Sequence, residues 1–135
     1  MKWLTLIGRI LYGGFFFYNG LNHFLSLNAL TGYAQSKGVP APQLAVIVSG
    51  LLILIGGVLI LLGWKVRLGA WLIVLFLVPV NFMMHAFWVE TDPGARTREM
   101  ISFMKNIALL GAALMVMLPT SWPLALEKPT GSSPS

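Results

Sequence analysis

Long apolar runs restrict the fold of this chain more than any other feature of its sequence. Residues 4–25, 44–62, 68–89 and 100–118 each form a run of roughly the length that a helix needs to cross a hydrocarbon core, about 20 residues. Only 10% of the residues are charged, against about 25% in an ordinary soluble domain. The sequence therefore predicts an all-α integral membrane four-helix bundle in residues 1–118, followed by a disordered tail in residues 119–135.

An even number of crossings would place both termini on the same side of the membrane. Basic residues favour cytoplasmic loops. The N-terminus, the short loop at 64–67 and the tail carry Lys2, Lys65, Arg67 and Lys128, whereas the opposite loops carry Lys37, Arg96 and Arg98. The dense charge in the 64–67 loop indicates cytoplasmic termini in the inner membrane of a bacterial-type cell.

Polar side chains interrupt three of the four apolar runs. Asn81 and His85 are one helical turn apart, and the group of Asn19, Asn22 and His23 recurs in the first run. Ser102, Lys105 and Asn106 interrupt the last run. Ionisable groups within a membrane segment are costly and mark functional sites. With a rise of 1.5 Å per residue, all three groups are expected in the outer half of the bilayer.

These groups define the candidate ligand site. The residues expected to line one cavity are His23, Asn81, His85, Lys105, Asn106, Asn19 and Trp88. No acidic residue falls within the four predicted spans, so an inward-pointing Lys105 is expected to find a carbonyl or aromatic partner and to lie within hydrogen-bonding reach of another site residue. Arg9, near the entry of the first run, is expected either as a structural charge inside the bundle or as a side chain that reaches the headgroups.

Two further features concern the connections between the spans. Residues 26–37 are less apolar and are followed by Gly38 and Pro40, which predicts a short interfacial helix over the His23 end of the bundle. Pro79 is expected to kink the third helix and to leave a carbonyl near position 75 without its partner.

The residue types in the predicted site suit a lipid-soluble quinone. Imidazole, amide and ammonium groups donate hydrogen bonds to carbonyl oxygens, while aromatic side chains pack on a ring. Haem held between His23 and His85 ranks below quinone, and no metal site is predicted. A different reading is a structural or assembly subunit whose glycine-rich second helix packs against a larger complex. Whether the chain catalyses a reaction, or forms a homo-oligomer, is left open.

Two exclusions narrow the function. The chain has no cysteine, so it performs no thiol–disulfide exchange itself. The net charge of +5 comes from basic residues at the ends of apolar runs, where membrane orientation explains them, and nucleic acid is therefore not an expected partner. The expected partners are the lipid bilayer and a membrane or periplasmic redox protein.

The order of several short motifs resembles the DoxX family over residues 5–118. The motifs are Arg9 with a Gly- and Phe-rich stretch up to Asn22-His23, Gly38-Val39-Pro40, Gly56-Gly57 leading to Gly63, Lys65-Val66-Arg67, and His85 with Phe87. The resemblance implies a four-helix inner-membrane bundle related to the small subunits of thiosulfate:quinone oxidoreductase and linked to quinone-dependent redox systems.

The sequence departs from this family pattern in the second helix. Many family members look to carry a glutamate a few residues before the Gly-Gly pair, and this chain has Ile53-Leu54-Ile55 there. A proton-handling role that needs this carboxylate is not expected of this chain.

Overall fold

The computed structural model describes residues 1–127, which form helices joined by short connections. The helices are α1 (Lys2–Leu25), α2 (Leu27–Ser36), α3 (Pro42–Leu62), α4 (Val66–Met84), the short 3-10 helix η1 (Phe87–Val89) and α5 (Pro93–Val116). The described residues contain no strand. This confirms the all-α prediction and the helix expected within residues 26–37.

Three stretches are long and apolar enough to cross a membrane, namely Pro42–Leu62, Val66–Val89 and Pro93–Val116. The chain is therefore an all-α membrane protein. Helix α1 is about as long as these three stretches. It is not apolar enough to be counted with them among the described residues, because it carries Arg9, Asn19, Asn22 and His23. Its crossing, the first of the four expected, stays a prediction.

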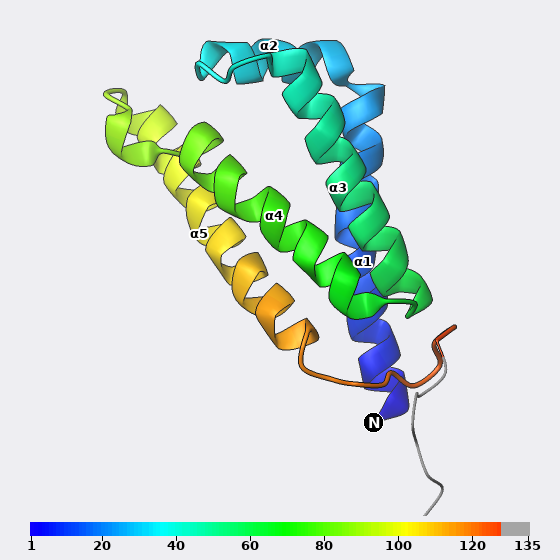
Figure 1. The fold of residues 1–135 in the computed structure, drawn as a ribbon. Coiled ribbons are helices and arrows are strands. Elements are labelled where there is room, and N and C mark those ends of the chain that lie inside the picture. Colours follow the sequence, from blue (N-terminus) through cyan, green and yellow to red (C-terminus); the bar gives the residue numbers. More distant parts are fainter. Residues whose placement is uncertain (128–135) are drawn as a thin grey trace, which may run out of the picture.

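The long helices form two pairs. α1 lies beside α3 and α4 lies beside α5, and the two pairs approach each other at the end near the α3–α4 loop and separate toward α2, which lies across the other end (Figure 1). Met1 and the C-terminal end of α5 lie at the same end of the molecule, as the sequence predicted.

Glycines set how closely α3 approaches its neighbours. A Cβ atom on Gly57 would lie 2.6 Å from the backbone nitrogen of Phe17 and 2.7 Å from the carbonyl oxygen of Gly13, so α1 and α3 touch through their backbones. A Cβ atom on Gly56 would lie 2.8 Å from the carbonyl oxygen of Gly69 on α4. The small-residue positions of α3 therefore pack within this chain, and an assembly partner that needs them is not supported.

Arg9 is a buried charge that joins three segments. Its side chain is only 2% exposed. The guanidinium donates to the carbonyls of Pro123 (2.9 Å) and Leu124 (2.5 Å), and to the carbonyls of Ile60 and Leu61 at 3.5 Å. The last two belong to the final turn of α3, where the helix dipole presents negative charge. Arg9 thus acts within the protein and does not reach the headgroups.

The segment after α5 differs from its prediction as a disordered tail. Arg9 binds its carbonyls, and the backbone nitrogens of Leu126 and Glu127 donate to the carbonyls of Leu62 (2.9 Å) and Gly63 (3.2 Å). Residues 119–127 are therefore attached to the end of α3. The rest of the predicted tail, 128–135, lies outside the described residues.

Candidate functional site

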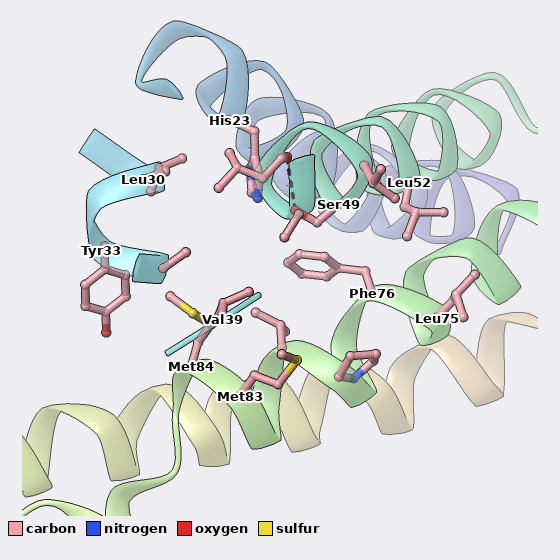
Figure 2. Close-up of a pocket in the computed structure, with 16 residues that line it drawn as sticks. His23, Leu30, Tyr33, Val39, Ser49, Leu52, Leu75, Phe76, Met83 and Met84 are labelled. Carbon is pink, nitrogen blue, oxygen red and sulfur yellow. Dashed lines mark hydrogen bonds between the residues drawn. The ribbon is translucent and has the colours of Figure 1, made fainter. Parts of the chain in front are cut away.

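An apolar cavity of about 470 Å³ lies where the two helix pairs separate (Figure 2). Its walls come from α2, α3 and α4, with His23 of α1 and Val39 of the α2–α3 connection, and all but three of the lining residues are apolar. The polar ones are His23, Tyr33 and Ser49. A concave, mostly apolar space of this volume with a few polar groups is typical of sites for small molecules.

His23 occupies this wall because α3 makes room for it. A Cβ atom on Gly50 would lie 2.7 Å from the Cβ of His23, so the glycine lets the imidazole sit against α3. The ring nitrogen Nδ1 lies 2.7 Å from the carbonyl oxygen of Asn19, one turn earlier in α1. The ring also meets Phe76 of α4 edge-on, with centroids 6.0 Å apart. His23 thus faces the cavity in a fixed orientation.

The α4 wall contains the proline noted in the sequence. Leu75, Phe76 and Pro79 all line the cavity. Because Pro79 has no N–H, the carbonyl of Leu75 loses the partner that a helix supplies four residues later. This wall therefore carries a backbone acceptor that lacks its usual donor four residues later.

A polar cluster lies beside the cavity and joins α2 to α4 and α5. We call Tyr33, Lys37, His85, Glu90 and Glu99 the rim cluster. The Glu99 carboxylate accepts from the Tyr33 hydroxyl at 2.5 Å and from His85 Nδ1 at 2.7 Å, and it lies 3.3 Å from Lys37 Nζ. Lys37 also donates to Glu90 at 2.9 Å. Tyr33 belongs both to this cluster and to the cavity wall.

Burial and charge keep the Tyr33 hydroxyl protonated. Desolvation, followed by the hydrogen bond and charge of Glu99, raises the pKa of Tyr33 to about 12. For Lys37, burial alone would lower the pKa, but the hydrogen bond to Glu90 and the contacts with Tyr33 and Glu99 raise it overall. Both groups therefore remain donors to the carboxylates near neutral pH, and they hold α2 against α5.

The replacement Glu99→Gln is expected to loosen α2. A glutamine keeps one acceptor oxygen, but its NH₂ group would face groups that now donate hydrogen bonds to the carboxylate. Hydrogen bonds to charged groups contribute about 1.5 to 3 kcal/mol each. We expect amide hydrogen exchange in residues 27–36 to become at least about tenfold faster. Glu90→Gln is the matched control, because Glu90 has one of these partners, and it should change the exchange less. Equal exchange in the two variants would contradict the role given to Glu99.

The seven residues predicted as one ligand site do not meet in this cavity. Of them only His23 lines it. His85 belongs to the rim cluster, and Asn19 donates to the carbonyl of Phe15 within its own helix at 2.7 Å. The reason is the pairing of the helices. Helix α1 runs alongside α3, whereas α4 runs alongside α5, so groups at equal depth lie on separate pairs (Figure 1).

The other four predicted residues lie on or beside α5. The Asn81 amide is buried and donates to the carbonyl of Phe103 at 3.3 Å, while its Oδ1 has no partner. Asn106 is also buried, at 7% exposure. Lys105 is exposed, with Nζ 5.6 Å from the centre of the Phe15 ring, and among the residues 1–127 it makes no hydrogen bond to Asn81 or to either histidine. Trp88 packs on Phe103, with ring centroids 5.6 Å apart.

Sequence reasoning missed Glu99 because it placed residues 90–99 in a loop. Helix α5 instead begins at Pro93, with the Asp92 side chain accepting from the backbone nitrogen of Ala95 at 2.9 Å. An aspartate followed by proline is a known start signal for a helix, and it was present in the sequence. The expectation that no acidic residue lies in a span was therefore wrong.

Comparison with known proteins agrees with this class of small all-α membrane protein. The family model described as DoxX matches residues 4–86, which is more than half of the chain and includes α1 to α4. The chain belongs to the DoxX family. It is similar to the inner membrane protein YphA of Escherichia coli (strain K12), with 27% identity over 125 residues that cover 93% of this chain and 89% of YphA. No solved structure matches it.

Proposed function

We propose that this DoxX family protein binds a lipid-soluble ring compound of the quinone class in the cavity between α3 and α4. The observation that carries the proposal is the cavity itself: about 470 Å³, apolar walls, and one imidazole held in a fixed orientation. A ring head would pack against Phe76 and its substituent would reach His23, while an isoprenoid or alkyl tail would contact the apolar side chains.

We also propose the topology that this function requires. α1 contacts α3 through Gly13 and Gly57, and again where a Cβ on Gly20 would lie 2.7 Å from Leu54, so a membrane that contains α3 also contains most of α1. Helix α1 then crosses the membrane as well, which brings the number of crossings to the four expected. The similarity to an inner membrane protein supports an inner-membrane location. With the basic 64–67 loop on the cytoplasmic side, the termini are cytoplasmic and α2 lies at the outer face.

A membrane redox partner is part of the proposal. The chain has no cysteine, so thiol chemistry that delivers electrons to a quinone must come from another protein. In this role the chain supplies the binding site and the partner supplies the electrons.

The alternatives are less well supported by the geometry. Haem held between His23 and His85 needs both rings at one cavity, and His85 lies instead against Glu99. The assembly role was based on the glycines of α3, and these contact α1 and α4.

The proposal is tested by titrating the purified protein, in lipid nanodiscs, with a short-chain 1,4-benzoquinone. Saturable binding of about one equivalent is expected above the partitioning measured with empty nanodiscs. Uptake that never saturates and equals the empty-disc value would overturn the proposal.

A further inference from the structure

We infer that the cavity binds the hydroxyl-bearing form of its ring ligand, a hydroquinone or phenol, in preference to the carbonyl-bearing quinone. The inference rests on the proposed function and specifies the chemistry of the ligand at that same site. It follows from counting which hydrogen-bond donors and acceptors the cavity wall leaves free.

The side-chain donors of the wall are already in use. The Tyr33 hydroxyl donates to Glu99 at 2.5 Å, and the Ser49 hydroxyl donates to the carbonyl of Val46 at 3.1 Å. A carbonyl oxygen only accepts, so the 2.7 Å contact with Asn19 requires that His23 carries its hydrogen on Nδ1. Each of the three polar side chains therefore directs its proton at the protein and not at the cavity.

The backbone of the wall offers no donor either. The nitrogens of Leu30, Val39 and Ala45 donate to carbonyls of Ser26, Ala34 and Ala41 at 2.9, 3.1 and 2.9 Å. Pro79 has no N–H, and the remaining lining residues lie within α1 to α4, beyond the first turn of each helix, where each nitrogen donates to the residue four positions earlier.

The wall does retain acceptors. With Nδ1 protonated, Nε2 of a neutral His23 ring is an acceptor, and it has no partner among the described residues. The carbonyl of Leu75 lacks its helical partner because of Pro79. The oxygen of Ser49 also keeps free lone pairs.

This imbalance discriminates between the two forms of a ring ligand. A quinone carbonyl placed against this wall meets only acceptors and leaves its oxygen without a hydrogen bond. A ring hydroxyl donates to His23 Nε2 and satisfies both groups. Leaving a buried polar group unpaired typically costs enough to change an affinity by about tenfold or more.

The test compares a short-chain alkyl-1,4-benzoquinone, its hydroquinone kept reduced under argon, and the dimethyl ether of that hydroquinone. Binding to the full chain in nanodiscs is measured for all three compounds in the same mildly alkaline buffer. We expect the hydroquinone to bind at least about tenfold more tightly than the quinone or the ether. The variant His23→Phe removes the acceptor, and the preference for the hydroquinone over the quinone should fall to about threefold or less. His23→Gln keeps a polar group of similar reach whose amide can donate, and it should bind the quinone more tightly than the native protein does.

The outcomes separate the inference from the function on which it rests. Equal or tighter binding of the quinone by the native protein would overturn the inference and leave the proposed function standing. Saturable binding of none of the three compounds would overturn both. A hydroquinone preference that persists unchanged in both His23 variants would remove His23 as the acceptor and overturn the inference as stated.

Discussion

The replacement Gly57→Leu is expected to separate α1 from α3 and to cause the largest loss of stability of any single change proposed for this protein. The reason is that the contact is between backbones: a Cβ atom at this position already falls within 2.7 Å of Phe17 and Gly13 atoms that no rotamer change can move. Overpacking of this kind costs about 1 to 3 kcal/mol, and more where backbone must shift. A branched side chain adds to that displacement.

The measurement is the fraction of protein that remains monodisperse after heating in detergent. We expect the midpoint temperature of Gly57→Leu to fall by about ten degrees or more, which corresponds to a loss of about 3 kcal/mol in the free energy of unfolding. Gly8→Leu is the matched control, because a Cβ atom on Gly8 meets nothing within 4 Å and the residue is exposed on α1. Equal midpoints for the two variants would contradict the close pairing of α1 with α3.

The second large effect is expected from Ala45→Phe, which fills the cavity from the α3 wall. Ala45 lines the cavity, so the added ring occupies the space assigned to the ligand head. We expect ring-compound affinity to fall by at least about tenfold, equivalent to about 1.4 kcal/mol. Thermal stability should change little, since the ring enters existing space and buries apolar surface.

Ala108→Phe provides the control for this variant. Ala108 is exposed on α5 and does not line the cavity, so the same chemical change there adds a ring on the lipid-facing surface. Its affinity should equal that of the native protein. A similar loss of affinity in both variants would place the ligand on the general surface and not in the cavity.

The helices were predictable because each follows from a local property of the sequence. An uncharged apolar run as long as residues 44–62 favours a membrane-spanning helix. Pro42 at the first helical position and Gly63 just past the last one mark where this helix begins and ends. The start of α5 was misplaced by seven residues because the polar residues after Pro93 resemble a loop, although the Asp92 cap was readable.

The cavity was not predictable in the same way. Depth along each helix can be counted from the sequence, but which helices are neighbours depends on contacts such as Gly57 with Phe17 and Gly56 with Gly69, which join residues distant in the chain. The counting placed His23, His85 and Lys105 at one level and assumed that a common level meant a common site. The residues that form the wall, such as Val46, Leu52 and Met83, are ordinary apolar residues and carry no signal of a cavity.

Photoaffinity labelling in native membranes reports directly where a ring ligand binds. An azido-quinone probe is activated by light, and the modified peptides are mapped by mass spectrometry. Binding in the cavity predicts labels in residues 45–52 of α3 and 75–84 of α4, which are lost in Ala45→Phe and suppressed by excess unlabelled ligand. Labels spread over exposed α5 residues such as Ile101 and Met104, and unchanged by Ala45→Phe or by competitor, would contradict it.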